Sequence, residues 1–268
     1  MQPPRSDDAE TLATLRARID EIDASMQQLL QQRAEVIDAL VAAKKTATGA
    51  AFRPDREAAM MQRLRERHAG NLPFVAIAHI WRVIISTFTQ LQAPFDVHIV
   101  AGDDALRDTA RYQFSFSSPL REWPDRDAAL AQIDGASKDL ALVPPGGSGD
   151  WWSAAIARGA QVIAALPEIE TGLPPALVFA AGSVDVSELP CVVISLNGNY
   201  GAAFAAFEPG DAALSLAGSG ADGAALFAVR RAQAEDFVRR AEAAGLTVTP
   251  AGGIAAPEAM LDATQVLA

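Results

Sequence analysis

The sequence has 268 residues, of which 50% are hydrophobic, and a formal net charge of −11. The negative charge makes nucleic acids and anionic membrane surfaces poor partners, because their phosphate groups would be repelled. A single cysteine, Cys191, leaves no disulfide framework and no cysteine-based metal site.

Three helices are predicted over the first 92 residues. The first runs from about Asp8 to Lys45 without an internal glycine or proline. A break at TATGAAFRP follows, and a second helix begins after Pro54, because proline suits the first turn of a helix. The third helix is expected from about Pro73 to Gln92.

After residue 93 the pattern changes to short apolar runs that alternate with helical segments. The apolar runs are FDVHIVAG, KDLALVP, AQVIAALP, PALVFAAG, CVVISL and AALFAV. The helical segments are DALRDTARYQF, RDAALAQI, DWWSAAIARG and AQAEDFVRRAEAAG. Such alternation is typical of an α/β domain with a largely parallel sheet. The sequence therefore predicts two domains, an all-α three-helix domain over residues 8–92 and an α/β domain over residues 94–268.

No metal-binding or targeting pattern is found. The histidines at positions 68, 79 and 98 lack the spacing of metal ligands, and we expect no metal ion. The opening segment MQPPRSDDAE lacks the charged and then apolar pattern of a signal peptide. No wholly apolar run reaches the ~18 residues that span a bilayer. We expect a soluble, cytoplasmic protein with no membrane partner.

Two cations of the first helix lie where core-facing residues are expected. The apolar stripe of this helix comprises Leu15, Ile19, Ile22, Met26, Leu29, Leu30, Val36, Ile37 and Leu40. Arg33 falls inside the stripe, and Lys44 lies within about 20° of Arg33 around the helix. Burying an unpaired cation is costly, so each of these side chains needs an anion. The anion is either an internal carboxylate, for which Glu57 is the best candidate, or a small anionic ligand.

Two further cations favour the ligand and indicate a second chain. Arg16 and Arg56 also lie near predicted inner faces, which makes more cations than one carboxylate can pair. Arg16 is roughly 25 Å from Arg33 along the helix, so both cannot hold one small molecule from the same chain. The first helix is also too long to bury its stripe within one small bundle. We therefore predict an intertwined homodimer in which Arg16 crosses the interface.

Four segments together resemble the helical AroQ class of chorismate mutases: LRARIDEID, LLQQRAEVIDALVAAKK, RPDREAAMMQRL and HIWRVIISTFTQLQ. The resemblance covers residues 12–92. It implies the pericyclic rearrangement of chorismate to prephenate in aromatic amino-acid biosynthesis, including phenylalanine biosynthesis. This reaction moves no proton and forms no covalent intermediate, so no cofactor, base or nucleophile is expected.

The resemblance implies a role for each matching cation and its neighbours. Arg33 would bind one carboxylate of chorismate, Arg16 from the second chain would bind the other, and Arg56 would support this end of the site. The ether oxygen that breaks would receive hydrogen bonds from Lys44 and Gln92, with Lys44 supplying the larger electrostatic share.

Three further positions are assigned from the resemblance. One matches the family, and two depart from it. Glu57 would accept a hydrogen bond from the ring hydroxyl. Arg53 stands where the family usually has an acidic residue, and Phe88 stands where it usually has serine. We expect both departures to modulate the rate rather than abolish it.

Residues 96–182 resemble a degenerate prephenate dehydratase domain, a two-lobed α/β fold related in shape to periplasmic binding proteins. The segment DLALVPPGGSGDWWSAAI is similar to the family's PxxNSxxG segment, but it keeps only Pro144, Ser148 and a glycine and lacks the asparagine. PALVFAAG has neither the threonine nor the arginine of the expected Thr-Arg-Phe motif. We therefore predict loss of dehydratase activity. Trp151 and Trp152 are expected to pack against the sheet, and the tail after residue 223 is expected to complete the α/β domain.

Three functions thus remain from the sequence. The first is a chorismate mutase, and the second is a bifunctional chorismate mutase/prephenate dehydratase. The third is a non-catalytic sensor of chorismate, prephenate or an aromatic amino acid, which Arg53 and Phe88 favour. Against the sensor stand Arg16, Arg33, Lys44, Glu57 and Gln92, which all match the family.

Overall fold

The computed structural model describes residues 6–43, 52–147, 149–168, 171–198, 213–219 and 223–255. The chain divides into two compact units, Met1–Thr48 and Gly49–Ala268. The predicted boundary near residue 92 differs from this division, because the second and third helices belong to the larger unit. The predicted domain limits themselves stay a prediction.

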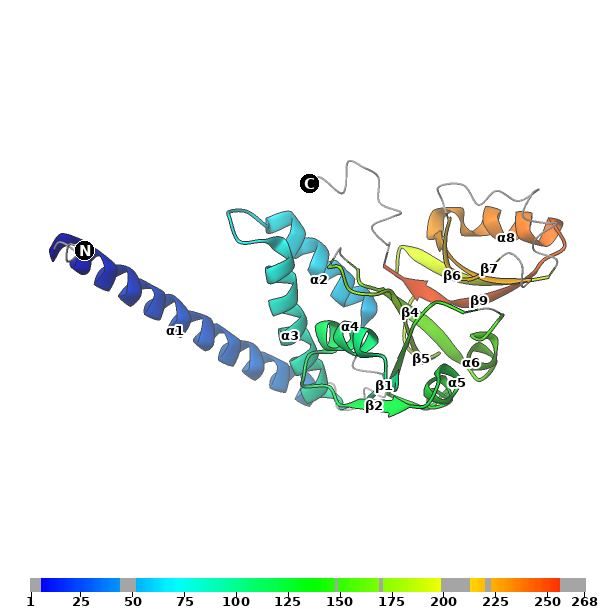
Figure 1. Ribbon diagram of the computed structural model, residues 1–268, viewed down its shortest axis with the longest axis horizontal. Coiled ribbons are helices and arrows are strands. Elements are labelled where there is room, and N and C mark those ends of the chain that lie inside the picture. Colours follow the sequence, from blue (N-terminus) through cyan, green and yellow to red (C-terminus); the bar gives the residue numbers. More distant parts are fainter. Residues whose placement is uncertain are drawn as a thin grey trace. The chain divides into compact units, whose positions relative to one another are not determined.

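The smaller unit is built on one continuous helix, α1 (Ser6–Ala43), which extends over 38 residues (Figure 1). At 1.5 Å per residue such a helix is about 57 Å long. The predicted long helix is confirmed, whereas Lys44 and Lys45 lie outside the described residues. Its apolar stripe is exposed, with Leu15 at 56%, Met26 at 51% and Leu29 at 63%. The apolar side chains of this stripe are therefore not buried by the smaller unit itself, as those of a core-facing helix would be.

The larger unit begins with helices α2 (Pro54–Arg67) and α3 (Phe74–Gln92), which pack on each other. Pro54 occupies the first helical turn, as predicted. α3 also packs on α4 (Asp104–Phe114), where the Ser86 hydroxyl donates to the Phe114 carbonyl. These contacts place the two helices and the following α/β segment in one folded body.

A mixed nine-stranded sheet forms the centre of the larger unit in the described part of the chain. Its order is β2-β1-β3-β5-β4-β9-β6-β8-β7. The strands are β1 (Val97–Val100), β2 (Leu120–Trp123), β3 (Leu140–Val143), β4 (Ala160–Leu166), β5 (Ala176–Ala181), β6 (Cys191–Asn197), β7 (Ala213–Ser219), β8 (Ala224–Arg230) and β9 (Thr247–Ile254). The predicted helical part followed by an α/β part is confirmed. The tail joins this same sheet through β8 and β9, as predicted.

The prediction of a largely parallel sheet is wrong. β1 runs parallel to β2 and β3, and β4 runs parallel to β9. The other five pairs are antiparallel: β3–β5, β4–β5, β6–β8, β6–β9 and β7–β8. Parallel neighbours need a crossover of about a dozen residues or more, and the connections of β4 to β5 and of β7 to β8 are shorter than that.

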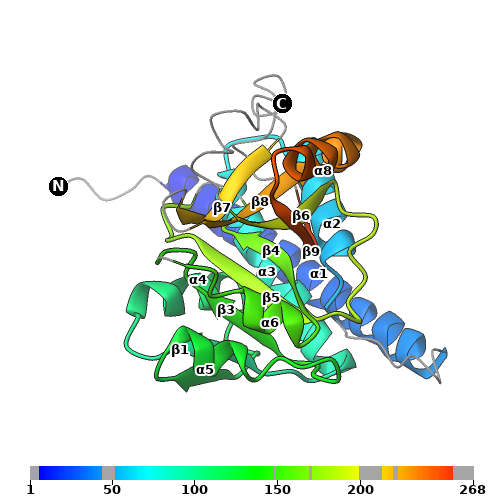
Figure 2. The ribbon, with the colours of Figure 1, turned by 90° about the vertical axis from the view of Figure 1, so that its right-hand side faces the viewer.

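In the described residues, the further helical elements are α5 (Arg126–Leu130), α6 (Ser153–Ala157), the 3₁₀ turn η2 (Arg231–Gln233) and α8 (Ala234–Ala243). Aspartates cap α4 and α5, because the Asp103 side chain accepts from Leu106 N and Asp125 accepts from Ala128 N. In Figure 2, α8 lies beside β6 and β8, α5 lies beside β1, and α6 lies beside β5.

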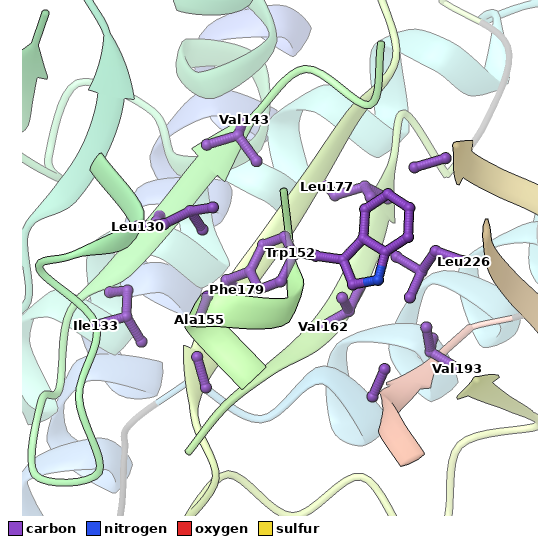
Figure 3. Close-up of a cluster of buried hydrophobic side chains, with 14 of the residues drawn as sticks. Leu130, Ile133, Val143, Trp152, Ala155, Val162, Leu177, Phe179, Val193 and Leu226 are labelled. Atoms are coloured by element: carbon purple, nitrogen blue, oxygen red, sulfur yellow. The ribbon is translucent and has the colours of Figure 1, made fainter. Parts of the chain in front are cut away.

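Alternate residues of central strands such as β5 and β8 face different cores, so both faces of the sheet are covered. In β8, Leu226 and Ala228 join the core that includes α5 and α6, whereas Phe227 and Val229 join the core under α8. The remaining core lies between α4 and the β1–β5 part of the sheet. Figure 3 shows Trp152 among side chains of the first core, and its indole Nε1 donates to Ser195 Oγ at 2.8 Å. The predicted packing of Trp152 against the sheet is confirmed.

A glycine allows the two halves of the sheet to meet. β4 and β9 pair through Val162 and Gly252, whose φ is 136°. A side chain at position 252 would collide with the Val162 backbone carbonyl and would also be strained at this φ. Gly252 is thus required by both the close approach and the backbone conformation.

α3 is long and apolar enough to cross a bilayer by length and composition, which the sequence interpretation excluded. That interpretation counted only wholly apolar runs, and α3 reaches the length once Arg82 is included. Arg82, Ser86 and Thr89 of this helix are buried against the rest of the unit. We interpret α3 as a core helix of a folded domain.

Candidate functional site

The two arginines of the first helix lie on α1, as predicted. Arg16 and Arg33 are separated by roughly 25 Å along the helix axis. Lys44 follows the last described residue of α1 and lies outside the described residues. The gathering of Arg33 and Lys44 with residues of α2 and α3 stays a prediction.

Glu57, predicted to face the substrate hydroxyl, is buried on α2 and forms an internal ion pair. Its Oε2 accepts from Nη1 of Arg82 on α3 at 2.9 Å. Arg82 also donates through Nη2 to Oε2 of Glu168, which follows β4. An internal salt bridge of Glu57 was one alternative from the sequence, but its partner is Arg82 rather than a stripe cation of the first helix.

The electrostatics of this group are governed by burial. Burial raises the pKa of Glu57 to about 7, with Arg82 opposing the rise and Glu168 adding to it. Burial alone would lower the pKa of Arg82, but Glu168 and Glu57 together raise it. Arg82 therefore stays a cation, while Glu57 changes its protonation near neutral pH.

Tyr112 of α4 completes the surroundings of this ion pair. Burial raises its pKa, and the charges of Arg82 and Glu168 also act on it. Its hydroxyl is buried and has no hydrogen-bond partner among the described residues. The ring stacks on His79 of α3, with 5.0 Å between centroids.

The other predicted residues of the larger unit are not joined to this ion pair by a described contact. Gln92 donates through Nε2 to the backbone oxygen of Phe88 at 3.0 Å, so its side-chain amide is hydrogen-bonded within α3 itself. Phe88 itself is buried. Arg53 precedes α2, with Nε 3.6 Å from Asp55 Oδ1, and Arg56 is exposed. Their roles toward a substrate stay predictions.

Arg82 and Glu168 were missed by the sequence reasoning. Arg82 carried the same signal as Arg33, since it is a single charge inside the apolar run HIWRVIIS. Glu168 carried no local signal, because it lies in a polar connection between two strands and its partner is remote along the chain. Its contact depends on how α3 packs against the end of β4.

The segment that resembles the dehydratase loop follows β3. Pro144 is half-buried, and Ser148 lies outside the described residues. Trp151 packs under Arg126, whose guanidinium carbon is 4.1 Å from the ring centroid. Arg126 also donates to the Gly146 carbonyl at 2.5 Å. The loop after β3 is thus held against α5 by contacts of Arg126 with Trp151 and Gly146.

The histidines make packing contacts. His98 is buried, accepts from the Trp123 indole at 2.9 Å and lies 3.2 Å from Asp139. His68 packs against Phe74. No group of three or more histidine, cysteine or acidic side chains is placed to hold a metal ion within the described ranges.

Comparisons with known proteins agree with the helical part. Residues 15–93 match the family model of chorismate mutase type II. Similar curated proteins are the bifunctional chorismate mutase/prephenate dehydratases of Neisseria gonorrhoeae (27% identical over 136 residues), Stutzerimonas stutzeri (24% over 143 residues) and Pseudomonas aeruginosa (28% over 139 residues). No solved structure matches the chain significantly.

Each match covers only part of this chain and only part of the relative. They cover 50%, 51% and 50% of this chain and only 37%, 39% and 36% of the respective relatives. The chain therefore spans less than two-fifths of the curated relatives that it matches. Each match is longer than the whole stretch up to residue 93, so it includes part of the chain that follows the helices. Residues 15–93 are thus the part of the chain that matches the chorismate mutase type II family model.

Proposed function

We propose that the protein is a chorismate mutase that converts chorismate to prephenate. The observation that carries the proposal is the family match over residues 15–93, which includes every cation assigned to the substrate. These residues and their polar neighbours are Arg16, Arg33, Lys44, Arg56, Glu57 and Gln92.

The chemistry of the rearrangement fits this set of side chains. Chorismate carries two carboxylates, and negative charge develops on its ether oxygen as the bond breaks. Arg33 and Arg16 neutralise the carboxylates and hold the compact, reactive conformer. Lys44 and Gln92 donate to the ether oxygen, which stabilises the transition state more than the ground state.

We also propose that the active form is a homodimer. The exposed stripe of α1, with Ile19 at 56% and Val36 at 68%, is a surface that a second α1 helix would bury. The axial separation of Arg16 from Arg33 supports the same assembly, because one small ligand cannot reach both on one chain.

A second candidate is a bifunctional mutase and dehydratase, favoured by the names of the three relatives and by matches that extend past residue 93. Against it stand the missing asparagine in VPPGGSG and the missing Thr-Arg-Phe motif. Loss of water and carbon dioxide from prephenate needs a polar group that assists the departing hydroxyl. We infer that the α/β part does not catalyse this step.

Product analysis tests these alternatives together. The purified protein incubated with chorismate should consume it and accumulate prephenate, with no phenylpyruvate beyond the rate of a protein-free sample of prephenate. Enzyme-dependent phenylpyruvate would establish the bifunctional enzyme instead. Binding of chorismate without turnover would favour the sensor.

Subunit complementation tests the shared site. Arg16→Ala chains and Arg33→Ala chains should each be nearly inactive, because each lacks one carboxylate-binding group in every site. After subunit exchange, a mixed dimer contains one site with both arginines and one with neither, so about half of the wild-type activity per mixed dimer should return. The measurement is the chorismate turnover of the mixture against each variant alone. Exchanged dimers without recovered activity would contradict the shared site.

A further inference from the structure

Three charged side chains from distant segments are buried together in the larger unit. Side-chain exposure is 3% for Arg82, 11% for Glu57 and 18% for Glu168. Two carboxylates thus share one guanidinium, and the group carries one excess negative charge when all three are ionised. An excess buried charge is unfavourable, so the two carboxylates compete for Arg82.

The competition takes place within hydrogen-bonding distance. Arg82 reaches Glu57 with Nη1 at 2.9 Å and reaches Glu168 with Nη2, so each carboxylate holds one arm of the guanidinium. A guanidinium that satisfies two acceptors in one plane fixes the position of both. The position of the Glu57 carboxylate therefore depends on where Glu168 holds Arg82.

Two further titratable side chains lie beside this ion pair, Tyr112 and His79, whose rings stack with 5.0 Å between centroids. Tyr112 of α4 faces Arg82 and Glu168, and burial raises its pKa. The charges that act on Glu57 in the described part of the chain are those of Arg82 and Glu168, and together with burial they bring its pKa to about 7. Small changes in this group therefore alter the charge of Glu57 near neutrality.

Glu168 belongs to the α/β part and lies beyond the family match at residues 15–93. We propose that Glu168 is a positioning residue for the mutase site, which competes with Glu57 for Arg82 and so sets the orientation and charge of the Glu57 carboxylate toward the substrate hydroxyl. This inference rests on the proposed mutase function and assigns the α/β part a role in that same site. The second part of the chain then tunes the first through a direct contact.

The decisive variant is Glu168→Gln. It leaves Arg82 to Glu57 alone, which favours the Glu57 carboxylate, so the acid limb of the kcat/KM profile for chorismate should move to lower pH by about one unit. At pH 6 this corresponds to about a five-fold rise in kcat/KM, with little change at pH 8.5. Glu168→Asp keeps the charge and should keep the limb near its wild-type position.

The matched control is Glu188→Gln, which removes the same charge from an exposed position of the same unit. It should leave the pH profile unchanged. If Glu168→Gln lowers thermal stability but leaves the acid limb in place, Glu168 is only a structural clamp and the proposal is wrong. Should Glu168→Gln not fold, the proposal is judged on Glu168→Ala, which removes the same charge and must then move the acid limb to lower pH.

A second readout separates this inference from the proposed function. The Glu57 carboxyl carbon can be titrated by NMR in the full chain without substrate, and Glu168→Gln should lower its midpoint. A lowered midpoint in a protein that does not turn over chorismate would refute the mutase proposal and leave the coupling intact. An unchanged midpoint in an active mutase would refute the coupling alone.

Discussion

Replacing Lys44 by alanine should lower kcat/KM for chorismate by about 10²–10³-fold, the usual effect of removing a charge-stabilising donor from an active site. The reason is that negative charge develops on the ether oxygen as it leaves, and an ammonium group at that oxygen stabilises the transition state. Most of the loss should appear in kcat, because the carboxylates of the substrate remain bound by arginines. The measurement is initial-rate kinetics with chorismate.

The chain offers a matched control at the next position. One residue corresponds to about 100° of rotation in a helix, so a helix that continues through Lys44 would place Lys45 on a different face, and Lys45→Ala should retain activity within about two-fold. Binding of prephenate, measured by calorimetry, should survive in Lys44→Ala. Equal losses for both lysines, or no loss for Lys44→Ala, would remove Lys44 from the site.

Replacing Arg82 by alanine should destabilise the protein by about 3–5 kcal/mol, because it leaves two carboxylates buried without their shared cation. For a unit of this size the melting temperature should fall by roughly 10 °C. The loss should be measured by denaturant unfolding at pH 8 and again at pH 5. It should be smaller at pH 5, where Glu57 can take up a proton.

The direction of that pH effect follows from the pKa of Glu57. Folding raises it from 4.5 to about 7, so the native state binds more protons than the unfolded state between these values. The contribution of Glu57 to stability is therefore fully present below about pH 4.5 and is lost as the pH rises through about 7.

Arg121→Ala is the control for Arg82→Ala. Its pair with Asp96 is also direct, at 2.6 Å, but the arginine side chain is 58% exposed. Water solvates both charges there, so the expected loss is below about 1 kcal/mol. Adding Glu57→Gln and Glu168→Gln to Arg82→Met should recover most of the stability, because no buried charge then remains. Similar losses for Arg82 and Arg121 would contradict the assignment of a buried ion pair.

The helices and the class of the fold can be predicted from local patterns in the sequence. α1 follows from a long stretch without glycine or proline, and α2 begins at Pro54, where the missing amide hydrogen does no harm. α4 has the predicted limits because Asp103 caps its first turn. These are local effects, each set by neighbours within a few positions along the chain.

The relative directions of the strands and the edges of the sheet depend on contacts between segments that are remote along the chain. Both faces of the sheet are buried, so antiparallel strands such as β5 and β8 are as continuously apolar as parallel ones. Two of the strands that match none of the predicted apolar runs, β2 and β7, are the edges of the sheet. In β2, Arg121 and Glu122 are exposed and Leu120 and Trp123 are half-buried, and an edge strand needs no continuous apolar run.

The candidate site divides in the same way. Sequence spacing alone placed Arg16 and Arg33 on one helix and identified Glu57 as the acid with a buried role. It could not pair Glu57 with Arg82, nor bring Glu168 to that pair from beyond the helical segment. A charge inside an apolar run shows that a partner is needed, but the partner is chosen by how remote elements pack, and no local pattern encodes that choice.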